Sequence, residues 1–223
     1  MNSNLIKRIF KRSLTLILII VLLLLAACSL LEKTQVPQED SDQFVLEGLV
    51  LSNETIFVTS SKPKDILSFE LIIIDSSNEN KSRYPGSLME FVVSEKIRES
   101  YPMQATSISS KVINEKSQTI TAHIDLVDKI MNHMPDDTVL IDVRTPEEFS
   151  NGHLAGSINL PLDSLEELVL EKVKDKDKTV LLYCRSGNRS ATAASILKEL
   201  DYSIVFDLGG INTYQGDLLQ GVN

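Results

Sequence analysis

Apolar runs of strand length alternate with helical stretches over the C-terminal half of this chain, and no other feature limits its fold as strongly. The strand-like runs are "TVLIDVR" (138–144), "SINLP" (157–161), "TVLLYC" (179–184) and "SIVFDLGG" (203–210). Apolar residues with helical spacing fill residues 125–134, 162–173 and 190–201. Strands that alternate with helices form a parallel sheet covered on both faces. We therefore predict an α/β domain over residues 119–223, with a first short strand in "TITAHI" (119–124).

Residues 44–113 follow a different pattern. Short runs rich in β-branched and aromatic residues are separated by turn-forming stretches; the runs are "FVLEGLVL", "TIFVTS", "LSFELIIID", "LMEFVVS" and "ATSISSKVI". They predict four or five strands in a small all-β barrel or sandwich, joined to the α/β domain by a linker at residues 114–118. "IRESYPMQ" (97–104) resembles a signature of a small β domain of unknown function in lipoproteins of Gram-positive bacteria. We identify no catalytic constellation here, and the sequence indicates no partner for this domain.

The first 27 residues have the build of a secretory signal. Four basic residues precede an almost purely apolar run, residues 14–27, which is short for a bilayer span of about 20 residues. The run ends in "LAAC" (25–28), which resembles the lipobox of bacterial lipoprotein signals. This resemblance implies cleavage before Cys28, lipidation of its sulfur and a tether over residues 28–43. The alternative is an uncleaved anchor helix extended through Leu31.

Both alternatives predict the same location for the rest of the chain. The basic flank stays inside, so the folded part is expected on the extracytoplasmic face of the cell membrane. The resemblance of residues 97–104 implies that this is the membrane of a Gram-positive bacterium. The formal net charge is −9, and removal of residues 1–27 would take away basic residues only. A protein surface with this negative net charge is repelled by anionic lipid, so the acyl chains must hold the protein at the membrane. It also lacks the clustered Lys and Arg of a nucleic-acid surface, and we expect no nucleic-acid partner.

The cysteine count points to one residue. The chain has two cysteines, Cys28 and Cys184, and lipidation would consume the first. Cys184 is then the sole thiol of an exported protein, and an exposed thiol in an oxidising compartment is expected to have a chemical use. The sequence carries no zinc signature, phosphate-binding loop or dinucleotide fingerprint, so we expect neither a metal nor a cofactor.

Cys184 ends an apolar strand, and the chain then turns directly into a helix. Ligands in open α/β sheets bind beyond the carboxyl ends of the strands. The amides of the turn can converge there, and the helix dipole favours negative charge, so we expect a thiolate with a pKa below about 8.5. Gly187 allows the backbone to curl, and Arg185 and Arg189 add positive charge. The pattern predicts a cradle for an anionic sulfur species.

Three motifs resemble the rhodanese family. "CRSGNRS" (184–190) is similar to the active-site loop of single-domain rhodaneses, and "LIDVRTPEEFSNGHLAGSINLP" (140–161) to the first rhodanese signature. "LGGINTY" (208–214) resembles the closing motif, with Tyr214 in place of the usual Trp. The resemblance implies a rhodanese fold and sulfur transfer. Cys184 would take a sulfur from thiosulfate or a persulfide, hold it as a persulfide and pass it to cyanide or an external thiol.

The resemblance also assigns roles to the neighbouring residues. The amides of the loop would cradle the persulfide; its residues are Arg185, Ser186, Gly187, Asn188, Arg189 and Ser190. Arg185 is the side chain expected to meet an anionic donor, whereas Arg189 either shares that role or braces the loop. Asp142 and Arg144 are expected to form a structural pair that supports the loop, with Glu148 and His153 as scaffold contacts.

Two alternatives to the sulfurtransferase remain. The first is a cysteine-dependent phosphatase or arsenate reductase, whose active-site loop has the pattern His-Cys-x5-Arg, with Arg six positions after Cys. Here Tyr183 precedes Cys184, and Arg189 follows five positions after it, so the shorter loop suits a sulfur atom better than a phosphoryl group. The second alternative is a non-catalytic rhodanese-like binding or signalling module. Retention of Cys184 favours the enzyme over this module.

Overall fold

The structure is a computed structural model, and it describes residues 43–62, 69–75, 83–94, 97–98, 100–115 and 118–221. The predicted signal, Cys28 and nearly all of the tether lie outside these residues. Asp42–Asn223 form one compact unit. Among the described helices, none combines the length and the apolar character that crossing a membrane requires.

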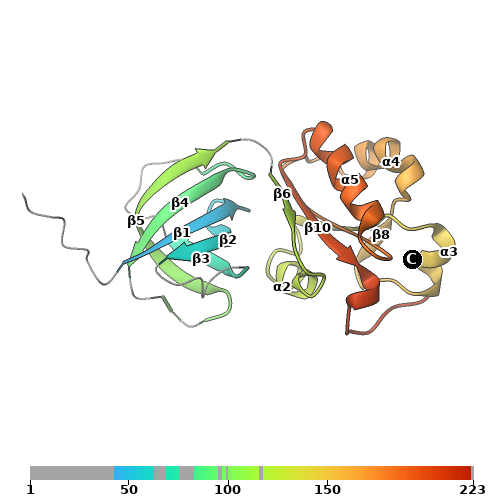
Figure 1. The fold of residues 1–223 in the computed structure, drawn as a ribbon, viewed down its shortest axis with the longest axis horizontal. Coiled ribbons are helices and arrows are strands. Elements are labelled where there is room, and N and C mark those ends of the chain that lie inside the picture. The colour runs from blue at the N-terminus through green and yellow to red at the C-terminus, as the bar shows by residue number, and fades with distance from the viewer. Residues whose placement is uncertain are drawn as a thin grey trace, which may run out of the picture. The chain divides into compact units, whose positions relative to one another are not determined.

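The N-terminal part of this unit is a closed β-barrel (Figure 1). Its strands are β1 (Gln43–Val50), β2 (Thr55–Lys62), β3 (Leu71–Asp75), β4 (Leu88–Ser94) and β5 (Met103–Asn114). They follow the order β1-β2-β3-β5-β4, and β4 pairs with β1 to close the barrel. The β3–β5 pair is parallel and the other pairs are antiparallel. The all-β prediction is confirmed, and of its two forms the barrel is the one observed.

Side-chain alternation fills the interior of the barrel. Along β4, Met89, Phe91 and Val93 are buried, and the residues between them are half-buried. These three pack with inward-facing residues of the other strands into one apolar cluster. The period of two in burial is what a strand with one face toward the barrel interior requires.

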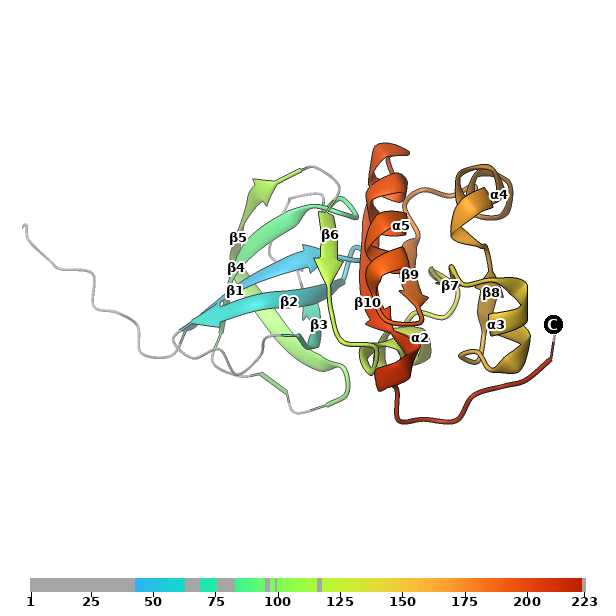
Figure 2. The same ribbon diagram turned by 45° about the vertical axis from the view of Figure 1, so that its right-hand side comes forward.

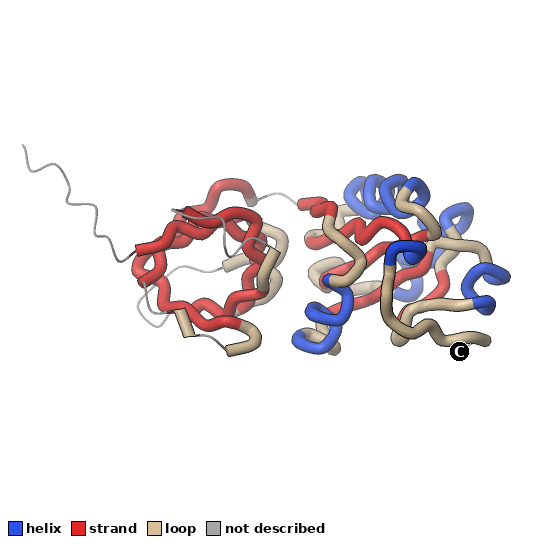
Figure 3. Tube along the Cα trace, turned by 60° about the horizontal axis from the view of Figure 1, so that its bottom comes forward, coloured by secondary structure: helices blue, strands red, loops and turns tan. Residues whose placement is uncertain are grey.

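The C-terminal part is a parallel sheet in the order β6-β10-β9-β7-β8. The strands are β6 (Gln118–Thr121), β7 (Thr138–Asp142), β8 (Ser157–Asn159), β9 (Thr179–Cys184) and β10 (Ile204–Gly210). The helices are α2 (Leu126–His133), α3 (Pro146–Asn151), α4 (Leu165–Lys172) and α5 (Asn188–Glu199), with short 3₁₀ turns at Leu162–Ser164 and Ile211–Thr213. Figure 3 shows helices on both sides of the strands. The predicted α/β fold class is confirmed.

Successive residues of β9 face opposite layers. Leu181 and Tyr183 join the cluster that contains α2, whereas Val180, Leu182 and Cys184 join the cluster that contains α4 and α5. All six residues of the strand are buried. A continuous apolar run is what a strand covered on both faces requires. The alternation also places the Cys184 side chain on the α5 side of the sheet.

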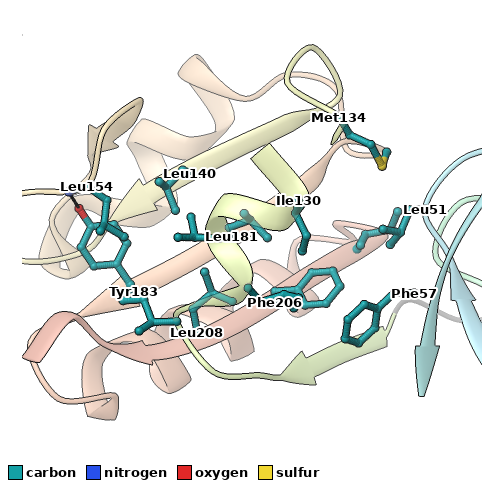
Figure 4. Close-up of a cluster of buried hydrophobic side chains, with 14 of the residues drawn as sticks. Leu51, Phe57, Ile130, Met134, Leu140, Leu154, Leu181, Tyr183, Phe206 and Leu208 are labelled. Atoms are coloured by element: carbon teal, nitrogen blue, oxygen red, sulfur yellow. Dashed lines mark hydrogen bonds between the residues drawn. The ribbon is translucent and has the colours of Figure 1, made fainter. Parts of the chain in front are cut away.

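The α2 layer includes side chains from the barrel (Figure 4). Leu51 and Phe57 lie in the same buried cluster as Phe206 of β10. The rings of Phe57 and Phe206 meet edge to face with centroids 5.1 Å apart. Lys129 of α2 also binds Glu70, which precedes β3, at 2.9 Å. The barrel and the parallel sheet thus share this apolar cluster, while the barrel interior forms a separate one.

Candidate functional site

The loop after β9 surrounds Cys184. The β9 strand ends at this residue and α5 begins four positions later, so residues 185–187 make the whole connection (Figure 2). The Cys184 side chain is only 1% exposed. The expectation of an exposed thiol was wrong, because the loop folds around the sulfur atom instead of presenting it. A donor must reach Sγ past Arg185, Ser186 and Asn188, which are exposed.

Two glycines give the loop its shape. Gly187 caps the N-terminus of α5 with a φ of 106°, in the left-handed region that side chains with a Cβ rarely adopt. Gly210, at the end of β10, lies directly against the loop. A Cβ added there would come within 2.6 Å of the Ser186 Cα and 2.7 Å of the Arg185 carbonyl oxygen. The end of β10 therefore fixes the position of the loop from behind.

Hydrogen bonds stabilise the negative charge on Cys184. Burial alone would raise the pKa of the thiol, but the backbone amides of Ser190, Ser186 and Gly187 outweigh burial and lower it, with help from the Ser190 hydroxyl. The Gly187 N–H lies 3.1 Å from Sγ. The predicted convergence of amides on the sulfur is therefore present. These amides therefore favour the nucleophilic thiolate over the neutral thiol more than water does.

Ser190 connects this loop to the neighbouring strand. Its hydroxyl lies 2.6 Å from Oδ1 of Asp207, which also accepts the N–H of Gly209 at 3.0 Å. The hydroxyl has further acceptors in Cys184 Sγ and the carbonyls of Gly187 and Gly209, and its single hydrogen serves one of them at a time. Asp207 is buried and was missed by the sequence analysis. The available signal was an acidic residue inside an otherwise apolar strand.

The Arg189 side chain points to α3. Its guanidinium binds Glu148 through two parallel hydrogen bonds of 2.7 and 2.8 Å. The hydrogen bond from Arg189 lowers the pKa of Glu148 to about 2, against the opposing effect of burial. Of the two roles considered for Arg189, bracing the loop is the one that this geometry supports.

Glu148 is held by the start of its own helix. Thr145 caps α3 and accepts the N–H of Glu148, while the Glu148 carboxylate accepts the N–H of Thr145. This capping box, with Pro146 in the first turn, is a recognised signal for a helix start. The sequence analysis did not predict α3, although "TPEE" carried that signal.

Asp142 and Arg144 form the structural pair that was expected. Both are buried, and their side chains meet at 2.6 Å where β7 ends. Arg144 also donates to the carbonyl of Gly152, which ends α3. Just beyond it, His153 stacks on Phe149 and pairs through its backbone with Leu219 of the returning C-terminal segment (Figure 2). The pair therefore ties β7 to the turn after α3, and the Arg144 guanidinium also lies 5.7 Å from the ring centroid of Tyr183, the residue before Cys184.

Arg185 differs from these two arginines. It is exposed, and within the described ranges it makes no ion pair. Tyr214 of the closing motif packs against the α2 cluster and donates its hydroxyl to Asp128 at 3.2 Å. No group of His, Cys, Asp and Glu able to hold a metal occurs among the residues that the structure describes. The site is thus a thiol of lowered pKa in a cradle of amides, with one exposed cation that has no ion pair among the described residues at its edge.

Residues 125–217 match the family described as Rhodanese-like domain. Over 71 residues the chain is 42% identical to the thiosulfate sulfurtransferase PspE of Escherichia coli. This alignment covers 32% of the present chain and 68% of PspE. The chain belongs to the rhodanese family. It is also 33% identical over 88 residues to the thiosulfate sulfurtransferase GlpE of Pseudomonas syringae, covering 37% of this chain and 81% of that one. A solved structure of a rhodanese with anions from E. coli is similar at 37% identity with a TM-score of 0.36, over 38% of this chain and 99% of the other.

The matched range contains every residue of the site. Cys184, its loop, the Asp142–Arg144 pair and the Glu148–Arg189 pair all lie within residues 125–217. The barrel lies before that range, so the family match gives it no role.

Proposed function

We propose that this rhodanese is a sulfurtransferase that carries a sulfur atom on Cys184. The observation that carries the proposal is a buried thiol at the end of a parallel strand with the Gly187 amide 3.1 Å from its sulfur, and the loop amides lower the pKa of that thiol. Relatives that share this part of the chain are named thiosulfate sulfurtransferases, which supports the assignment. The donor is thiosulfate or a persulfide, and the acceptor is cyanide or a thiol.

In the first half-reaction the Cys184 thiolate attacks the outer sulfur of the donor. With thiosulfate, the new S–S bond forms as the old S–S bond breaks, and sulfite leaves with the bonding electron pair. The product is a Cys184 persulfide anion, and no proton is consumed. The amides of Ser186, Gly187 and Ser190, which stabilise the thiolate, are placed to stabilise the persulfide charge as well.

In the second half-reaction an external nucleophile takes the outer sulfur. Cyanide attacks it to form thiocyanate, or a thiolate attacks it to form a new persulfide, and Cys184 leaves as the thiolate. Besides Cys28 the chain has no other cysteine, so it offers no second thiol to receive the sulfur within the folded part. The acceptor is therefore a separate molecule, and the kinetics are ping-pong.

The proposal places the reaction outside the cytoplasm. It rests on the basic n-region, the apolar run and "LAAC" at residues 25–28. We expect Cys28→Ala to release the protein or to leave it as an unprocessed precursor. A Cys28→Ala protein of mature size in the membrane fraction would contradict the lipid anchor and leave the sulfur chemistry untouched.

Mass spectrometry of the intact protein tests the sulfur-carrier function. After incubation with thiosulfate, wild-type protein should gain the mass of one sulfur atom on Cys184, and cyanide should remove it. Cys184→Ser should gain nothing while keeping the same circular dichroism spectrum. If no sulfur donor modifies Cys184, the binding-module alternative is favoured. If the protein hydrolyses an aryl phosphate in a Cys184-dependent way, the phosphatase alternative is favoured.

A further inference from the structure

The charges around Cys184 are unevenly paired. Behind the loop, Arg144 is neutralised by Asp142 and Arg189 by Glu148. A further carboxylate, Asp207, lies against the Ser190 hydroxyl. Arg185 is the one cation of the loop without an ion pair in the part of the chain that the structure describes. The site therefore offers a single uncompensated positive charge together with its amides.

The Glu148–Arg189 pair lies within electrostatic reach of the sulfur. The pKa of Arg189 is raised, first by its hydrogen bond to Glu148 and then by the negative charges of Glu148 and Cys184. Arg189 belongs to the segment that wraps around Cys184, and Glu148 holds its guanidinium at 2.7 and 2.8 Å, so a negative donor at Cys184 meets an arginine whose charge is already paired. The Glu148 side chain is 28% exposed, so solvent weakens this effect without abolishing it.

From this arrangement we propose that Glu148 is a specificity-determining residue that cancels the charge of Arg189 and thereby favours singly charged sulfur donors over doubly charged ones. The inference rests on the proposed sulfur transfer and adds its donor class. A monoanionic thiosulfonate or persulfide places one negative charge against Arg185. Thiosulfate places two charges there, and the second one meets a site whose other arginines are already neutralised.

A matched pair of donors isolates this effect. Methanethiosulfonate differs from thiosulfate by a methyl group in place of one oxyanion, and it carries the same outer sulfur. Its attack by the Cys184 thiolate gives the persulfide anion and methanesulfinate, so atoms and charge balance as they do for thiosulfate and sulfite. Because the two donors differ in intrinsic reactivity, the informative quantity is how each variant changes the ratio of their kcat/KM values.

Glu148→Gln removes the charge and keeps the geometry. Glutamine fills the same position of a capping box and still accepts a hydrogen bond from Arg189. We expect this variant to raise kcat/KM for thiosulfate relative to methanethiosulfonate by about 3- to 10-fold, the effect of one unit charge at a partly exposed site. Glu147→Gln is the matched control, since Glu147 lies in the same first turn, is exposed and has no ion pair among the described residues. Its donor ratio should stay within about twofold of wild type.

The paired arginine provides a second, independent test. Arg189→Gln should shift the donor ratio the opposite way, because Glu148 then stands uncompensated. The double variant Glu148→Gln/Arg189→Gln should return the ratio to the wild-type value, since the neutral pair restores the original net charge. Arg185→Gln should disfavour thiosulfate most strongly. Thermal unfolding of each variant confirms that the fold is intact before rates are compared.

The experiment tests the specificity role of Glu148 separately from sulfur transfer by Cys184. If both donors form the Cys184 persulfide but Glu148→Gln leaves their ratio unchanged, or shifts it no more than Glu147→Gln, the specificity role of Glu148 is wrong and the sulfurtransferase stands. If neither donor modifies Cys184 in any variant, the proposed function fails and the inference fails with it.

Discussion

The barrel and the parallel sheet are built from similar apolar strands, but their strand ends are arranged differently. In the barrel most neighbouring strands run in opposite directions, so consecutive strand ends lie at opposite rims. In the sheet all strands run the same way, so β7, β9 and β10 bring Asp142, Cys184 and Gly210 to the same edge. A loop that follows one strand can then be shaped by residues that follow the others. Strand direction, more than strand composition, decides where a chemical site can be built.

The two parts nevertheless depend on a common apolar cluster. Phe57 comes from β2, is fully buried and contacts Phe206 of β10. We expect Phe57→Ala to lower the free energy of unfolding by about 3–5 kcal/mol in a single transition, because the lost ring belongs to both parts. Ile113→Ala, in β5 but 46% exposed, should change it by less than about 0.5 kcal/mol. Urea unfolding followed by circular dichroism measures both. Loss of the barrel alone, with the sheet unaffected, would show that the shared cluster does not couple them.

The close approach of β10 to the loop gives a second comparison between the parts. Gly210→Ala should cost about 1–3 kcal/mol of stability and slow persulfide formation, because its Cβ would collide with backbone atoms of Arg185 and Ser186. Gly48→Ala is the counterpart in the barrel, where a Cβ would come within 3.1 Å of the Phe57 carbonyl oxygen. That variant should lose stability without slowing the reaction per folded molecule. Equal kinetic defects in the two variants would mean that Gly210 has no special relation to the loop.

The sequence predicted the parts of the site that are local in the chain. Cys184, the turn at Gly187 and the start of the helix lie within a few positions, so pattern and chemistry sufficed. The contact of Ser190 with Asp207 crosses from α5 to β10 and depends on how the strands pair, which no local pattern contains. The burial of Cys184 was misjudged for the same reason, since Gly210 positions the loop from another strand.

For the fold as well, features set by neighbouring residues were predictable from the sequence, and pairings between distant strands were not. The apolar run at residues 88–94 correctly indicated a strand, whereas which of its side chains point inward was learned from the structure. The parallel pairing of β3 with β5 joins strands that are far apart in the chain, and no local pattern specifies it. Conversely, α3 was predictable from Thr145, Pro146 and Glu148, and the signal was overlooked.

Ser190 allows the electrostatics of the cradle to be measured directly. Its backbone amide and hydroxyl both lower the pKa of Cys184, and Ser190→Ala removes only the hydroxyl. We expect the midpoint of the pH profile for iodoacetamide alkylation to rise by up to about one pH unit, equivalent to about 0.5–1.5 kcal/mol. Ser195→Ala, an exposed site on the same helix, should leave the midpoint unchanged. An unchanged midpoint in Ser190→Ala would assign the whole shift to the amides.

The smallest expected effect concerns acid stability. The pKa of Glu148 is about 2 in the folded protein, below its ordinary value of 4.5. Its ion pair with Arg189 therefore stabilises the folded state above pH 4.5, and this contribution is lost as the pH falls towards 2. Glu148→Gln should lower stability at pH 7 by up to about 1 kcal/mol and by less at pH 3. Glu147→Gln supplies the baseline for removal of one exposed carboxylate. A Glu148→Gln deficit that grows on acidification would contradict the ion-pair account.

The central claim is that Cys184 accepts one sulfur atom and holds it as a persulfide until a separate acceptor molecule removes it. The most direct measurement is the sulfite released when wild-type protein meets excess thiosulfate without any acceptor. The account predicts a burst of one sulfite per Cys184 and no further release until cyanide is added, when thiocyanate appears in equal amount. Cys184→Ser should give no burst. Continuous sulfite release without an acceptor, or a full burst from Cys184→Ser, would contradict a sulfur carried on Cys184.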